Sequence, residues 1–113
     1  MRYLMIHYID ENIELTQDEQ AKVDTTMSAW LGEVERRGVS KHGSRLRPAA
    51  DATTVRVRGS QTLVADGPFA ETKEQIAGYD VIECADLDEA LEVAAGHPTA
   101  FLGVIEIRPL PAS

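Results

Sequence analysis

The sequence contains a single cysteine, Cys84, so no disulfide can form within one chain. It also lacks any apolar run near the roughly 20 residues that a membrane-spanning helix needs. The opening segment MRYLMIHYID is too short an apolar stretch for a secretory signal. These absences exclude a disulfide scaffold and predict a cytoplasmic protein without membrane contact.

Local catalytic and cofactor motifs are absent as well. No Gly-x-Ser-x-Gly element, phosphate-binding loop, dinucleotide fingerprint or Cys-x-x-Cys pair occurs. The three histidines, His7, His42 and His97, lie far apart along the chain and have no local metal-ligand spacing. A metal site could form from them only if the fold brought them together. We therefore expect neither a cofactor nor a metal.

Acidic residues outnumber basic ones, 19 to 11, and the net charge of −8 opposes nucleic-acid binding, which depends on clustered Lys and Arg. The charge is uneven, because residues 36–58 carry +6 and the remainder carries −14. This basic segment has three interpretations: a surface for an anion, one half of a self-complementary contact between subunits, or a solvated hairpin face.

Apolar periodicity and turn residues predict two helices, four strands and a hairpin. Thr16 and Glu19 have capping-box spacing before an amphipathic stretch at 17–37 that Gly38 ends. Asp86 and Glu89 repeat this spacing before a second helix that stops near residue 96. Strands are predicted at 2–9, 39–47, 76–84 and 102–109, with hairpin arms at 53–58 and 61–65 around Gly59-Ser60.

This order predicts an α+β fold, a ferredoxin-like βαββαβ domain over residues 1–113 with an inserted β-hairpin and an antiparallel sheet. Both helices should cover one face of the sheet and leave the other bare. A bare apolar face of that size is rarely left in water. We therefore expect a homodimer in which two sheets face each other as a dimeric α/β barrel around a cavity.

Three segments carry a resemblance to a known family: DGPFAETKEQ at 66–75, DLDEALEVAA at 86–95 and VIEIRPL at 104–110. With the opening MRYLMIHY, they make the chain resemble the DGPF family, a branch of the YCII-related proteins. The resemblance implies a dimeric α/β barrel. Some relatives look like small hydrolase or dehydrochlorinase-type enzymes, and DGPF proteins often accompany extracytoplasmic-function sigma factors. YCII-type relatives carry a proposed catalytic His in the first helix, where this chain has Thr25-Thr26-Met27, so that role does not transfer.

The DGPF motif has a structural and a functional interpretation. In the structural one, Asp66 accepts backbone bonds across a turn, Gly67 takes a positive φ, and Phe69 enters the core. In the functional one, the motif borders a ligand site that includes Asp66 and Phe69. The side chains that follow, Glu71, Lys73 and Glu74, are then either a catalytic acid–base group or a set of surface ion pairs.

The strands supply further candidates. Glu106 and Arg108 alternate with Ile105 and Ile107, so we expect the isoleucines under the helices and the charged pair on the dimer side. Placing Tyr3, Met5 and His7 on that same side would bring His7 near Glu106 or Arg108. There His7 is either a proton shuttle or a hydrogen-bonded structural residue.

Two residues of the strand at 76–84 need explanation. Asp80 shares a face with Ile82 and Cys84, so its carboxylate should have a partner or lie at a cavity mouth, where it could bind a ligand. Cys84 precedes the cap of the second helix and is either an activated thiolate or a buried, inert thiol.

Two hypotheses about function follow. In the first, the cleft of the homodimer binds a small polar or anionic molecule, with catalysis by Glu71, Lys73, Glu74 or His7 and ligand contacts from Asp66, Phe69, Asp80, Glu106 and Arg108. In the second, the protein is a non-catalytic accessory or sensor module that contacts a regulatory protein through its hairpin and basic segment.

Overall fold

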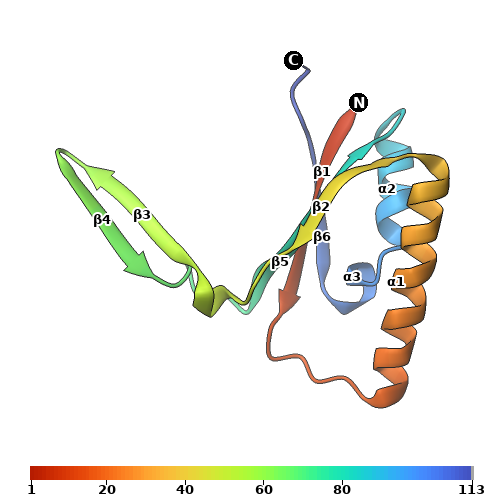
Figure 1. The fold of residues 1–113 in the computed structure, drawn as a ribbon, viewed down its shortest axis with the longest axis horizontal. Helices are drawn as coiled ribbons and strands as arrows, with labels where there is room; N and C mark the ends of the chain where they lie inside the picture. The colour runs from red at the N-terminus through yellow and green to blue at the C-terminus, as the bar shows by residue number, and fades with distance from the viewer. Residues whose placement is uncertain (113) are drawn as a thin grey trace.

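The computed structural model describes residues 1–112, and Figure 1 shows a sheet covered by helices on one side and a hairpin that projects from the other. The sheet has the strand order β2-β5-β1-β6, with all neighbours antiparallel. This is the predicted α+β split βαβ pattern with an antiparallel sheet and an inserted hairpin, so the predicted fold of the single chain is confirmed. The elements are β1 (Arg2–Asp10), α1 (Gln17–Arg37), β2 (Ser40–Arg45), η1 (Ala49–Asp51), β3 (Thr53–Arg58), β4 (Gln61–Asp66), β5 (Glu74–Glu83), α2 (Leu87–Ala95), α3 (Thr99–Leu102) and β6 (Val104–Pro109).

Both long helices begin where the capping residues predict. The Glu19 amide donates to Thr16 Oγ1 at 3.1 Å, and the Thr16 amide donates to Glu19 Oε1 at 3.0 Å, which is a complete capping box. Asp86 accepts from the Glu89 amide at 2.9 Å in the same way at α2. Gly38 ends α1 with a left-handed φ of 67°, a conformation that glycine adopts without a steric penalty. The four-residue helix α3 was not predicted.

The strand register shows which face of the sheet lies under the helices. Directly opposed residues share a face, and β1 pairs Met5 with Ile107 and His7 with Ile105. Met5 is fully buried, and both isoleucines pack against the core formed by the sheet and helices. The prediction for the isoleucines is therefore confirmed. The placement of Tyr3, Met5 and His7 on the dimer side was wrong, because these residues face the helices.

The opposite face of the sheet, called the open face below, has no helix over it (Figure 1). Its apolar side chains are half-buried or exposed, among them Leu4, Ile6 and Tyr79. Glu106 and Arg108 lie on this face as predicted, paired with Ile6 and Leu4 in the register. They bind each other, with Arg108 donating to Glu106 Oε2 at 2.6 Å, and are on the opposite side of the sheet from His7.

The hairpin β3–β4 forms a sheet of its own and leaves the body on the side away from the helices (Figure 1). The DGPF loop returns the chain from this hairpin to β5. Gly67 has a φ of 91°, which confirms the predicted positive φ. The turn is held by Gly67 N donating to Ala52 O at 2.7 Å and by Thr54 Oγ1 donating to Gly67 O at 2.8 Å. The prediction that Phe69 enters the core was wrong: the side chain is 80% exposed, because the loop lies outside the four-stranded sheet.

Within residues 1–112, no helix is both long and apolar enough to cross a membrane.

Candidate functional site

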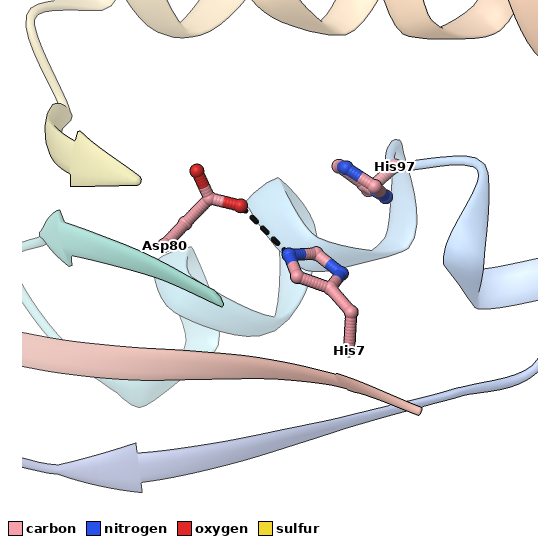
Figure 2. A group of neighbouring side chains, drawn as sticks. All are labelled: His7, Asp80 and His97. Atoms are coloured by element: carbon pink, nitrogen blue, oxygen red, sulfur yellow. Dashed lines mark hydrogen bonds and ion pairs between the residues drawn. The ribbon is translucent and has the colours of Figure 1, made fainter. Parts of the chain in front are cut away.

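Folding brings together two residues that the sequence separates by 73 positions, His7 of β1 and Asp80 of β5. His7 Nε2 lies 2.7 Å from Asp80 Oδ2, and Figure 2 shows the two side chains meeting on the helix side of the sheet. The register explains the contact: Asp80 lies opposite Met5 and His7 opposite Gly78, so the two are diagonal neighbours on one face. The carboxylate of Asp80 thus has a hydrogen-bond partner, which is one of the two alternatives predicted for it. We call this pair the dyad.

The hydrogen bond of the dyad fixes the tautomer of His7. An ionised carboxylate only accepts hydrogen bonds, so Nε2 carries the proton and neutral His7 leaves a lone pair on Nδ1. Among residues 1–112, His7 Nδ1 is a buried side-chain nitrogen with no hydrogen-bond partner. Leaving such an acceptor unsatisfied costs about 1–3 kcal/mol. The arrangement is that of an imidazole base held by a carboxylate through Nε2, while its basic nitrogen, Nδ1, makes no hydrogen bond within the described residues.

A second histidine, His97, packs against the ring of His7. Their ring centroids are 4.3 Å apart with planes tilted by 37°, and Trp30 meets His97 edge-on at 4.8 Å. His97 Nδ1 accepts from the Thr99 amide at 3.1 Å. Burial, and secondly the charge of His7, lower the pKa of His97 to about 4, while Asp80 acts in the opposite direction. His97 is therefore a neutral, buried ring packed against His7 at ordinary pH.

Gly43 of β2 provides the space that the Asp80 carboxylate occupies. It lies opposite Asp80 in the register, and a Cβ added at Gly43 would overlap Asp80 Oδ1. The same Cβ would lie 3.0 Å from the Tyr79 carbonyl oxygen, so the backbone leaves little room to adjust. The position of the carboxylate thus depends on the absence of a side chain on the neighbouring strand.

The same cluster offers the ligand atoms of a metal site. One ligand atom each from His7, Asp80 and His97 fall within 4.8 Å of one another, and two imidazoles with a carboxylate suit zinc. The geometry, however, is that of hydrogen bonding and stacking: the dyad is in direct contact at 2.7 Å, and His97 lies against the ring of His7. Positions 7, 80 and 97 form no local spacing pattern, so sequence motifs do not reveal this group.

The other residues proposed from the DGPF motif lie apart from the dyad. Asp66, Glu71 and Lys73 are exposed, and Glu74 is half-buried at the start of β5. Phe69 and Glu74 line a cavity of about 670 Å³ in the angle between the hairpin and the open face, which we call the elbow pocket. Its wall also includes Tyr8, Pro48, Thr54 and Ile76.

Cys84 is buried at 3% exposure, and burial raises the pKa of its thiol, followed by the charge of Glu89. The thiol is therefore protonated at neutral pH, which favours the inert interpretation.

Sequence reasoning missed His97 and Gly43. His97 sits between Gly96 and Pro98, where turn residues account for the pattern without a buried ring. No role was predicted for Gly43. A signal for Gly43 exists in the tight pairing of β2 with β5, but it becomes visible only once the register is known.

Comparison with known proteins identifies the family of the chain. The model of the YCII-related domain matches residues 1–111. An uncharacterized protein from Rhizobium meliloti (strain 1021) is 39% identical over 114 residues, covering 97% of this chain and 92% of the relative.

A solved structure has a similar fold at low sequence identity. It is the 5-chloro-2-hydroxyhydroquinone dehydrochlorinase TftG from Burkholderia phenoliruptrix AC1100, in complex with 2,5-dihydroxybenzoquinone. The match has a TM-score of 0.50 and 13% identity and covers 100% of this chain and 96% of the other. At this identity the likeness shows a common fold.

Proposed function

The chain belongs to the YCII-related family, and from this premise we propose that it binds a small polar or anionic molecule and acts on it by cofactor-free acid–base chemistry at His7. One observation carries the proposal: Asp80 holds Nε2 of His7 while the buried Nδ1 has no partner among the described residues. A carboxylate that fixes the tautomer of an imidazole and leaves its other nitrogen free is the arrangement of a general base.

A ligand would approach the dyad from the Asp80 side. The side chain of Asp80 is 17% exposed, against 6% for His7, and Gly43 beside it carries no side chain. Because His7 Nδ1 itself is buried, a ligand reaches it only after a neighbouring side chain moves. The buried ring of His97 lies against His7 and is the group whose displacement would open the site.

The similar fold of TftG supports hydroxylated quinones and phenols as the first class of ligand to test. Such molecules are small and polar, and their hydroxyl groups can donate a hydrogen bond or a proton to an imidazole nitrogen. This substrate class is proposed for the present chain on chemical grounds, with 2,5-dihydroxybenzoquinone as the probe.

Binding of 2,5-dihydroxybenzoquinone, measured by isothermal titration calorimetry, tests the proposal. We expect His7→Gln and Asp80→Ala to weaken binding by at least about tenfold, which is ~1.4 kcal/mol. Glu35→Gln is the matched control, because Glu35 is exposed on α1 and belongs neither to the dyad nor to the open face, so affinity should be unchanged. Equal affinity in the His7→Gln variant and the wild type would refute a ligand site at the dyad.

Assembly as a homodimer through the open face is part of the proposal. The apolar residues of that face, with Ile76 at 44% and Val104 at 50% exposure, need a cover. A twofold pairing of two open faces provides it. Glu74 and Phe69 of the elbow pocket, with neighbouring Glu71, Lys73 and Asp66, would then border the cleft between the subunits, together with Glu106 and Arg108. Under this arrangement Lys73→Ala should weaken the binding of a small anionic molecule in the cleft while leaving the dimer intact.

A second candidate function is that of a non-catalytic module that contacts a regulatory protein such as an extracytoplasmic-function sigma factor. One observation favours it: Arg56 and Arg58 are exposed on the projecting hairpin, and neither has a carboxylate partner within residues 1–112. In that case Arg56→Glu with Arg58→Glu would abolish binding of the regulatory protein, and the dyad variants would have no effect on it.

A further inference from the structure

The hairpin β3–β4 exposes apolar side chains on both strands. Val55 is 63% exposed, Val57 61% and Val64 65%, and Leu63 on the other face is 46% exposed. The register pairs Val55 directly with Val64, so the three valines form one continuous apolar strip. A two-stranded hairpin alone in water is marginally stable at best. This hairpin therefore needs a surface that covers its valine strip, and the rest of the same chain does not supply one.

The direction of the hairpin indicates where that surface lies. Helices α1 and α2 occupy one side of the sheet, and the hairpin leaves on the other, so it and the open face form the two sides of an angle (Figure 1). The elbow pocket lies in this angle, lined by Tyr8 and Ile76 from the sheet and by Thr54 and Phe69 from the hairpin side. A body seated in the angle would contact both the open face and the hairpin.

We infer that the hairpin is an arm that holds a second copy of this chain, and that the second copy closes the elbow pocket. Each copy has one uncovered sheet face and one uncovered arm, so a twofold pairing can cover all of these surfaces at once. Charge favours the same partner, because β3 carries Arg56 and Arg58 while the chain as a whole carries −8. The arginines of one arm would thus meet an acidic body.

This inference rests on the pairing of open faces proposed above and is independent of the acid–base role of His7. It goes further in assigning a role to the arm and in making the elbow pocket a site that both subunits complete. A ligand bound in the pocket would contact the Phe69 and Glu74 of one subunit and the surface of the other.

Removing the arm provides the first test. Gly67 N already donates to Ala52 O at 2.7 Å, so residues 53–66 can be replaced by Gly-Gly without moving the ends of the loop. Sedimentation equilibrium should show that the dimer dissociation constant of this variant rises by at least about tenfold. Circular dichroism establishes that the shortened chain has kept its fold.

A point variant keeps the inference testable if the shortened chain does not fold. Val55→Asp with Val64→Asp places two charges on the valine strip and should weaken the dimer by at least about tenfold. The matched control is Leu31→Asp with Leu91→Asp, because these leucines are 50% and 49% exposed on α1 and α2, away from the arm. The control should dimerise as the wild type does.

Cross-linking locates the arm. Ser60→Cys puts a thiol in the turn at the arm's tip, while Cys84 is buried and should not react. A photoactivatable maleimide on residue 60, in dimers mixed from ¹⁴N and ¹⁵N chains, should form links between differently labelled chains.

A wild-type chain that is monomeric at micromolar concentration would overturn the inference, as would an unaffected dimer in the arm variants or links found only within one chain. A regulatory protein captured by the arm of a chain that is monomeric would identify a different occupant. Ligand binding in the dyad variants is measured separately, so either proposal can fail without the other.

Discussion

Asp80 Oδ2 lies 2.7 Å from His7 Nε2, and the two residues belong to neighbouring antiparallel strands of one sheet. The contact joins a ring that is 6% exposed to a carboxylate that is 17% exposed, so solvent screens it little. Hydrogen bonds of a carboxylate to an imidazole are stronger than those between neutral groups. The orientation of the His7 ring is therefore set by Asp80. Because Nε2 is bonded to Asp80, Nδ1 is the nitrogen that is left without a partner among the described residues.

We predict that neutral His7 carries its proton on Nε2. Two-bond ¹H–¹⁵N correlation spectra distinguish the two tautomers of each histidine directly. In the Asp80→Ala variant the acceptor is lost, so His7 should populate both tautomers, and the free energy of unfolding should fall by about 1.5–3 kcal/mol. A wild-type His7 protonated on Nδ1 would contradict the assignment of Nδ1 as the basic atom.

Gly43→Ala should disturb the dyad without altering either of its residues. The new Cβ would overlap Asp80 Oδ1, so the carboxylate must move away from its present position. We expect the tautomer preference of His7 and the binding of 2,5-dihydroxybenzoquinone to weaken as they do in Asp80→Ala. Gly32→Ala in α1 is the control, because a Cβ there meets nothing within 4 Å. That variant should raise the free energy of unfolding by about 0.5–1 kcal/mol through helix propensity alone.

The sequence predicted the elements of the fold well because their signals are local. The pair Thr16 and Glu19 locates the start of α1, and Gly38 locates its end. The site was predicted less well because its signals are long-range. β1 has apolar residues on both faces, and only its pairing with Ile105 and Ile107 shows that His7 lies under the helices. Phe69 was misplaced for the same reason, since the path of the inserted hairpin depends on contacts that the DGPF motif does not contain.

The last prediction concerns His97 and the stability of the fold in acid. Burial lowers the pKa of His97 from 6.5 to about 4. Between these values the unfolded chain binds a proton that the folded chain does not, so the free energy of unfolding decreases as the pH falls from 6.5 to about 4. The full loss is roughly 3 kcal/mol, and below pH 4 both states are protonated and the dependence from this group ends.

Urea unfolding at a series of pH values measures this loss. The lowered pKa values of Glu19 and Glu89 contribute only below their ordinary value of 4.5, so the upper part of the window reports mainly on histidine. In His97→Gln the slope between pH 6.5 and 4.5 should decrease, whereas His42→Gln, which alters an exposed histidine, should retain it. His7, Asp80 and Trp30 all face the His97 ring, and an unchanged slope in His97→Gln would contradict the assignment of this pH dependence to His97. Because a proton on His97 would lie beside His7, protonation of the folded chain near pH 4 should also displace the ring that packs against His7.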